Sequence, residues 1–157
     1  MTEVERLAAI EEIKLVKSRY FRFGDTKDLV SMRTLFADDC VVDCSGSVTD
    51  PTTGEDAYPA VGSGELYGAD AVMAAFGKGE GITSIHHGYT PDVEILGDTS
   101  AKSIWAMTDR LFFADPSPVA QLTGYGHYHE TYEKIDGRWK IKTLRLTRLR
   151  VEVVRRD

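Results

Sequence analysis

The sequence predicts an α+β fold in which an N-terminal helical hairpin and a third short helix cover one face of a cone-shaped, curved antiparallel sheet. Helical periodicity is confined to the first half of the chain, whereas long stretches rich in Val, Ile, Trp, Tyr and Thr follow residue 82. Helices first and meandering strands last are typical of this class. A length of 157 residues with 42% hydrophobic content suits one domain, 1–157, with one core.

Three amphipathic or short apolar segments predict the helices. Between Leu7 and Phe23 an apolar residue recurs at every third or fourth position, and Gly24 should end this first helix. Asp25 or Thr26 could cap the second helix, which makes a hairpin with the first. We expect the helices at 7–24, 26–36 and 69–76.

The strands are predicted from β-branched and aromatic runs separated by turn signals. Val41 and Val42 mark a first strand, and turn signals at 96–98 and 135–137 separate the later strands into hairpins. The stretch 45–68 carries many Gly, Pro, Ser, Thr and Asp without any period. A long irregular stretch of this kind is usually a functional loop, so we expect it to form a lid over a pocket at the mouth of the cone.

Composition excludes several classes of partner. The formal charge is -6, and the basic residues form no stripe apart from a short run at the C-terminus, so nucleic acid is not an expected partner. No apolar stretch approaches the roughly 20 residues of a spanning helix, and the charged N-terminus is unlike a secretory signal. We expect a cytoplasmic protein without membrane contact, with Cys40 and Cys44 reduced and no metal site, because no zinc-ligand spacing is present.

Two neighbouring histidines are candidates for a general base. His86 and His87 lie in a predicted strand, where alternation sends their side chains to opposite faces, so that only one can face the pocket. A histidine near its ordinary pKa of about 6.5 can act as a base at neutral pH, above all when a carboxylate fixes its tautomer. A histidine that only packs in the core or on the surface is the alternative.

The end of the first helix adds Asp25 and Tyr20. The Asp25 carboxylate could approach the sheet and orient an imidazole, or it could cap the second helix. Tyr20 could place its hydroxyl in the pocket while its ring packs in the core, or it could be a plain core residue.

The later strands supply the other candidates. Asp109 shares a strand face with Trp105 and Met107, where a carboxylate needs a partner or a function unless it lies at the strand end in water. In the run 124–132, Tyr128 shares one face with Glu130 and Tyr132, and either face of this run could line the pocket. Arg145 or Arg148 could bind an anionic or carbonyl oxygen, since a bulge could turn either inward, or both could lie on a solvated face.

Together these residues resemble the pattern of the SnoaL-like family, the branch of the nuclear transport factor 2 superfamily that contains scytalone dehydratase, bile acid 7α-dehydratase and hexachlorocyclohexane dehydrochlorinase. In that family a tyrosine or lysine precedes an aspartate by five residues, as Tyr20 precedes Asp25, and an Ile-His-His-Gly segment follows at 85–88. The resemblance implies that His86 is the catalytic base. Asp109 matches the bile acid dehydratase pattern, whereas Tyr20 departs from the lysine of the dehydrochlorinase.

The resemblance implies a cofactor-independent lyase that dehydrates a small hydrophobic cyclic hydroxy-ketone, a steroid or a polyketide-like substrate. In this scheme His86 abstracts the proton, Asp25 orients it, Tyr20 assists the carbonyl or the leaving hydroxyl, and Asp109 is a second acid-base group. Isomerisation or cyclisation would begin with the same proton abstraction, and a noncatalytic ligand-binding module is the alternative outside catalysis. The family also implies a homo-oligomer, a trimer or dimer, assembled through the outer surface of the sheet.

Overall fold

The computed structural model describes residues 1–57, 64–79 and 81–157. The chain begins with the 23-residue helix α1 (Glu3–Asp25), whose start is fixed by a capping box between Thr2 and Glu5. Two shorter helices follow, α2 (Leu29–Arg33) and α3 (Ala69–Gly77). None of the helices in the described ranges is long and apolar enough to cross a membrane.

Seven strands form one sheet in the order β2-β1-β7-β6-β5-β3, with β4 also paired to β5. All neighbours are antiparallel except β1 and β7, which run parallel. The sheet is therefore mixed, and not wholly antiparallel as predicted. The strands are β1 (Phe36–Asp43), β2 (Glu65–Tyr67), β3 (Ile82–Gly88), β4 (Asp92–Ile95), β5 (Ser100–Phe113), β6 (Val119–Ile135) and β7 (Arg138–Arg155).

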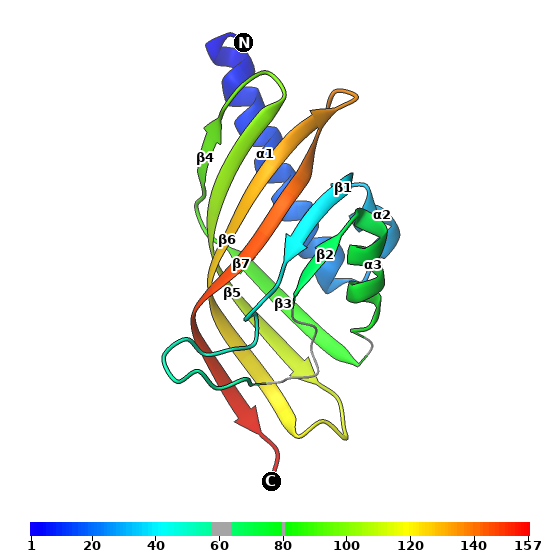
Figure 1. Ribbon diagram of the computed structural model, residues 1–157, viewed down its shortest axis with the longest axis vertical. Helices are drawn as coiled ribbons and strands as arrows, with labels where there is room; N and C mark the ends of the chain where they lie inside the picture. Colours follow the sequence, from blue (N-terminus) through cyan, green and yellow to red (C-terminus); the bar gives the residue numbers. More distant parts are fainter. Residues whose placement is uncertain (58–63, 80) are drawn as a thin grey trace.

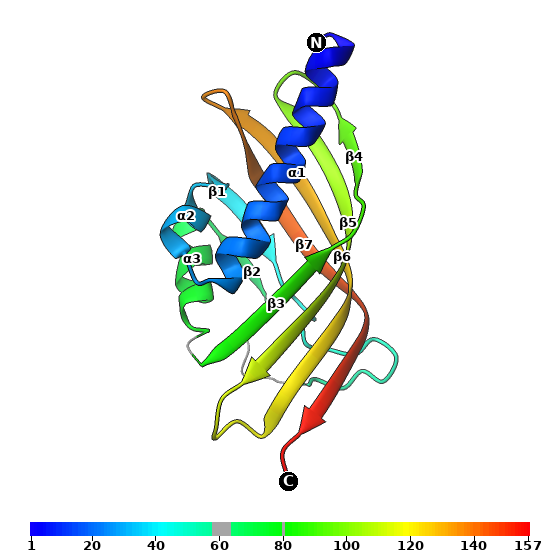
Figure 2. The same cartoon turned by 180° about the vertical axis from the view of Figure 1, so that it is seen from behind.

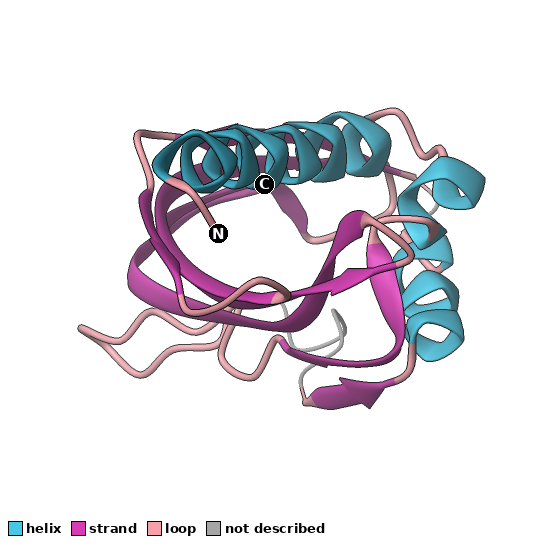
Figure 3. Ribbon diagram, turned by 90° about the horizontal axis from the view of Figure 1, so that it is seen from above, coloured by secondary structure: helices cyan, strands magenta, loops and turns pink. Residues whose placement is uncertain are grey.

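The sheet curves strongly, and α1 lies across its concave face (Figures 1 and 2). Seen from above, the sheet wraps around the interior and α1 covers the open side, while α2 and α3 stand at the edge near β1 and β2 (Figure 3). The predicted α+β fold with helices on one face of a curved sheet is confirmed, although the sheet does not close on itself.

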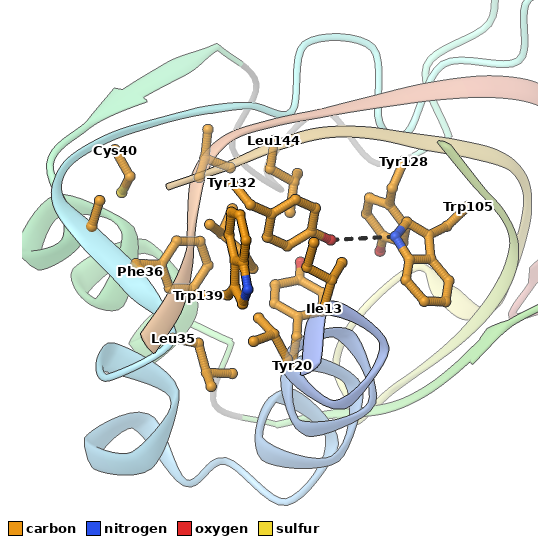
Figure 4. Packing of buried hydrophobic residues seen from close by; sticks show 14 of the residues in the cluster. Ile13, Tyr20, Leu35, Phe36, Cys40, Trp105, Tyr128, Tyr132, Trp139 and Leu144 are labelled. Carbon is orange, nitrogen blue, oxygen red and sulfur yellow. Dashed lines mark hydrogen bonds between the residues drawn. The ribbon is translucent and has the colours of Figure 1, made fainter. Parts of the chain in front are cut away.

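The core fills the space between α1 and the concave face. It includes the rings of Tyr20, Trp105, Tyr128 and Tyr132, and these residues approach one another in Figure 4. Alternation along β6 sends every second residue inward, among them Leu122 and Tyr128. Side chains that face this interior are therefore shielded from most of the solvent.

The second helix differs from the prediction. It spans only Leu29–Arg33 and is capped by Asp28, whose carboxylate accepts a hydrogen bond from the Ser31 N–H at 3.0 Å. Lys27 adopts a positive φ of 59°, which interrupts the helical path after α1 and delays the next start. Phe36, predicted as the helix end, begins β1 instead.

The described parts of the stretch 45–68 contain strand pairing that was not predicted. It contains the short strand β2, and Thr49 and Asp56 form an isolated bridge. Residues 58–63, which belong to the predicted lid, lie outside the described residues. Cys40 is buried and Cys44 half-buried, and neither is disulfide-bonded.

Candidate active site

Asp25 lies at the end of α1 and turns its carboxylate toward β3. Its Oδ1 lies 2.6 Å from His86 Nδ1 and accepts a hydrogen bond from the Ser84 hydroxyl at 2.9 Å, while Oδ2 accepts from the His86 backbone N–H at 2.9 Å. The cap of α2 comes from Asp28. Asp25 is therefore joined to the strand that carries the predicted base, and it does not cap the second helix.

The Asp25 contact fixes the state of the His86 ring. Burial by itself raises the pKa of the Asp25 carboxyl, but the hydrogen bonds from His86 and Ser84 outweigh burial, and the pKa lies below its ordinary value. A carboxylate accepts the proton of Nδ1, so the lone pair of the neutral imidazole lies on Nε2. The two side chains remain 24% and 15% exposed. Both side chains are therefore partly open to solvent.

Strand alternation along β3 selects His86 over His87. Ser84 and His86 are at least partly buried and contact Asp25, whereas Ile85 and His87 are exposed. The register pairs His86 with Asp109 of β5. The histidine that the family pattern indicates is thus the one that faces the interior.

The Phe21 ring packs against His86, and the rings of Tyr20 and Tyr128 pack against Phe21. Tyr20 packs edge-on against Phe21 and Tyr128, with ring centroids 5.7 and 5.9 Å apart. Phe21 lies nearly parallel to the His86 ring, at 12° and 6.1 Å. Burial raises the pKa of Tyr20 and of Tyr128 well above the ordinary value. Both phenols keep their protons at neutral pH and can donate hydrogen bonds.

Asp109 forms a buried ion pair with Arg148 of β7. The guanidinium donates to both carboxylate oxygens, at 3.0 and 2.9 Å, and its Nε donates to the Ser47 carbonyl at 2.6 Å. The Asp109 and Arg148 side chains are 5% and 4% exposed. Gly124 makes room for the pair, since a Cβ there would lie 2.2 Å from Arg148 Nη1 and 2.4 Å from Asp109 Oδ1.

The other predicted binding residues divide between the two faces of the sheet. Trp105 and Met107 are buried on the interior face with Asp109, and Arg148 Nη1 lies 3.5 Å from Met107 Sδ. Arg145 has the opposite parity to Arg148 on β7; its side chain is 68% exposed and pairs with Asp43 at 3.5 Å. The prediction that Arg145 lines the pocket is therefore corrected: it lies on the outer face.

One interior ion pair was not predicted from the sequence. Lys17 of α1 donates to Glu130 of β6, both side chains are fully buried, and Glu130 also accepts from the Tyr132 hydroxyl. The Lys17 ammonium lies over three rings, 3.5 Å from the centroid of Tyr128, 4.2 Å from that of Tyr20 and 4.8 Å from that of Phe21. Glu130 lies on the same face of β6 as Tyr128, so strand alternation could have predicted that it points inward. No pattern in the sequence indicated a role for Lys17.

Surface depressions occur elsewhere on the molecule. Three of them, each of about 440 to 460 Å³, lie beside the start of α1, on the outer sheet face around His129 and Arg145, and between the 50–57 loop and the end of β7. Within the described ranges no three His, Cys, Asp or Glu side chains gather as metal ligands would. Among the predicted site residues, the structure brings together Asp25 with His86 and Asp109 with Arg148.

Comparison with known proteins matches the sequence to a family model and to a curated protein. The family model of the SnoaL-like domain matches residues 5–145. A protein of Gibberella zeae named as a probable cyclase is 40% identical over 48 residues, which is 31% of this chain and 32% of that protein. The second match therefore spans only about a third of the curated relative.

Similar solved structures cover nearly the whole chain. A protein of Novosphingobium aromaticivorans with the provisional name scytalone dehydratase has a TM-score of 0.77 at 20% identity, over 99% of this chain and 94% of that one. A hexachlorocyclohexane dehydrochlorinase of Novosphingobium barchaimii has a TM-score of 0.77 at 15% identity, over 98% and 94% of the two chains. At these identities the likeness shows the fold.

Proposed function

Because the chain belongs to the SnoaL-like domain family, we propose that it is a cofactor-independent lyase of the dehydratase type. The substrate class is a small hydrophobic cyclic hydroxy-ketone, steroid or polyketide-like molecule. The observation that carries the proposal is the 2.6 Å contact between Asp25 and His86 Nδ1, which leaves the lone pair of Nε2 for a substrate proton. Similar folds in proteins named as a dehydratase and a dehydrochlorinase support an elimination.

In the proposed reaction His86 Nε2 removes the proton next to the substrate carbonyl. The electron pair of the broken C–H bond forms the new C=C bond, and the bond to the β-hydroxyl breaks. The imidazolium returns its proton to the departing hydroxyl, which leaves as water. Asp25 stabilises the imidazolium through Nδ1–H, a role that carboxylates take in acid-base pairs.

The other interior groups act on binding and on developing charge. Tyr20 donates a hydrogen bond toward the substrate carbonyl oxygen, where negative charge grows during proton abstraction. Tyr128, Trp105 and Met107 supply apolar wall. We assign Asp109 mainly to holding Arg148, since both of its oxygens accept from the guanidinium. This replaces the second acid-base role expected from the sequence.

The test is a panel of hydroxylated cyclic ketones assayed by mass spectrometry for loss of one water. We expect His86→Gln and Asp25→Asn to lower kcat/KM by about 10² to 10⁴-fold, the usual contribution of a positioned proton-transfer group. Asp28→Ala is the matched control, because Asp28 lies three residues from Asp25 and only caps α2. Full activity of His86→Gln would exclude this mechanism.

The same assay separates the alternatives. A product of unchanged mass that depends on His86 would indicate an isomerase or cyclase, which the partial match to a protein named as a cyclase favours as second candidate. Saturable binding of a ketone without any product would indicate a binding module. In each case we expect binding at the partly exposed Asp25–His86 pair and not at the outer depressions.

The proposal also includes the oligomeric state and the cellular location of the protein. The outer face of the sheet exposes Ile85 and Ile104, at 40% and 43%, and a dimer or trimer through this face would cover them. Light scattering after size exclusion measures the oligomeric state. A cytoplasmic location stays a prediction, which a cell-fractionation experiment can check.

A further inference from the structure

We propose that Phe21 is a positioning residue that holds the plane of the His86 imidazole, and that Gly88 is glycine to leave room for the Phe21 ring. The inference rests on the proposed function in that His86 is taken as the base. It concerns two residues that the acid-base scheme does not use. One of them, Gly88, closes the Ile-His-His-Gly segment noted in the sequence.

The contact with Asp25 holds one edge of the His86 ring. Asp25 lies 2.6 Å from Nδ1 and the Cβ–Cγ bond tethers the neighbouring ring carbon, so the remaining freedom is a rocking of the ring plane about this bond, which moves Nε2 on the far side. Phe21 packs its face along the imidazole, with 12° between the ring planes. A second contact on the ring face removes this freedom, so Nε2 points in one direction.

Gly88 provides the space that this arrangement needs. A Cβ at position 88 would lie 2.5 Å from Cε2 and 2.9 Å from Cζ of Phe21, closer than side-chain atoms approach. Gly88 is not among the glycines with a positive φ, so its backbone does not require glycine. The close approach of the Phe21 ring is therefore the reason that the structure gives for this glycine.

The Phe21 ring is partly buried, and three neighbouring groups oppose its movement away from such a Cβ. Its neighbours are the Tyr20 ring at 5.7 Å, the Tyr128 ring at 6.0 Å and the Lys17 ammonium at 4.8 Å. Close-packed surroundings of this kind transmit a displacement to what they touch. A side chain at position 88 would thus push Phe21 along the His86 ring.

The test compares Phe21→Leu, Gly88→Ala and the double variant with Phe23→Leu, a matched change on α1. Phe23 packs against the core and under the Arg22 guanidinium. We expect Phe21→Leu and Gly88→Ala each to lower kcat by about 10- to 100-fold, as a misplaced catalytic group does, with KM within about twofold because the pocket walls remain. Phe23→Leu should leave kcat unchanged.

The double variant gives the sharper result. If Gly88 serves only to make room for Phe21, Gly88→Ala should have almost no further effect on kcat in the Phe21→Leu background, since contacting residues are not additive. Full additivity of the two changes would overturn the assignment of Gly88. Unchanged kcat in Phe21→Leu would overturn the positioning role of Phe21.

A spectroscopic readout tests the inference apart from turnover. Carbon NMR relaxation of the His86 ring, assigned with His86→Gln, should show a rigid ring in the native protein and a more mobile ring in Phe21→Leu. Equal ring mobility in the two proteins would refute the positioning role even if no substrate is found. Loss of turnover in His86→Gln with an unchanged Phe21→Leu variant would leave the proposed function intact and remove only this inference.

Discussion

Two polar pairs join α1 to the sheet, one through Lys17 and the other through Asp25, eight residues later on the helix. The two pairs differ in their exposure to solvent. Lys17 and Glu130 are both fully buried, with the ammonium enclosed by three aromatic rings. Asp25 and His86 keep 24% and 15% of their side chains exposed. A sealed pair cannot exchange a proton with a substrate, whereas the half-open pair can. On this helix the fully buried pair at Lys17 therefore has a structural role, and the partly exposed pair at Asp25 is the one that is open to the proposed proton transfer.

The largest expected effect on stability comes from breaking the fully buried Lys17–Glu130 pair. Glu130→Gln should lower the free energy of unfolding by about 3–5 kcal/mol, because it leaves the Lys17 ammonium buried without its partner. Burial already lowers the pKa of Lys17 to about 8 in spite of the attraction of Glu130. Removal of Glu130 lowers this pKa further, so Lys17 should lose its proton in the folded variant.

Urea unfolding measures this loss, and a double variant is the control. Lys17→Met combined with Glu130→Leu removes both charges and should recover most of the stability, as apolar replacements of buried pairs do. If the double variant is as unstable as Glu130→Gln, the shape of the two side chains matters, and not their charge.

A change that crowds the Asp109–Arg148 pair should have an intermediate effect on the stability of the fold. Gly124→Ala places a methyl group against both side chains and should cost about 1–3 kcal/mol, the usual range for overpacking. The change should also loosen the 45–57 loop, because Arg148 donates to the Ser47 carbonyl. Thermal unfolding measures the first effect, and limited proteolysis of the loop measures the second.

A second glycine serves as the matched control for Gly124. A Cβ at Gly77, at the end of α3, would lie 3.5 Å from Leu29 Cδ1, which is an ordinary contact. Gly77→Ala should therefore keep or slightly raise the stability. An equal loss in both variants would show that the ion pair is not the cause.

Strand alternation explains why much of the interior could be predicted. Asp109 shares its parity with Trp105 and Met107, and the structure places all three on the interior face. Alternation alone left His86 and His87 open, and the family pattern selected His86, which contacts Asp25 together with Ser84. Arg148 also follows by alternation from Leu146, which is buried. The sequence could not show where β7 shifts its register against β6: the pairing is regular from Thr143 to Arg148 and shifts between Ile141 and Thr143 and again between Arg148 and Arg150.

Other features depend on contacts between distant segments and left no local signal. The parallel pairing of β1 with β7 joins residues about 100 positions apart. In the sequence, Lys17 is a single polar position within the apolar stripe of the first helix. Only the fold brings it to Glu130. The late start of α2 depends on a positive φ at Lys27, an uncommon conformation for a lysine.

The smallest expected effect on the free energy of unfolding comes from the Asp25–His86 pair, and it depends on pH. The folded-state pKa of Asp25 lies below its ordinary value, so its hydrogen bonds stabilise the fold above the unfolded pKa of about 3.9. This contribution is lost as the pH falls through the lower folded value. The Nδ1–H of His86 donates to Asp25 whether or not Nε2 carries a proton, so the contact persists down to that range.

Asp25→Asn isolates this contribution. The variant should be less stable than the native chain at pH 6. The difference should shrink as the pH falls below about 4, because Asp25 of the unfolded chain takes up a proton there while the folded carboxylate keeps its charge to a lower pH. Urea unfolding at a series of pH values measures the difference. A constant gap from pH 6 to pH 3 would mean that the carboxylate charge does not stabilise the fold. Because the pair is partly exposed, we expect this gap to be smaller than the loss in Glu130→Gln, while the loss of activity is larger.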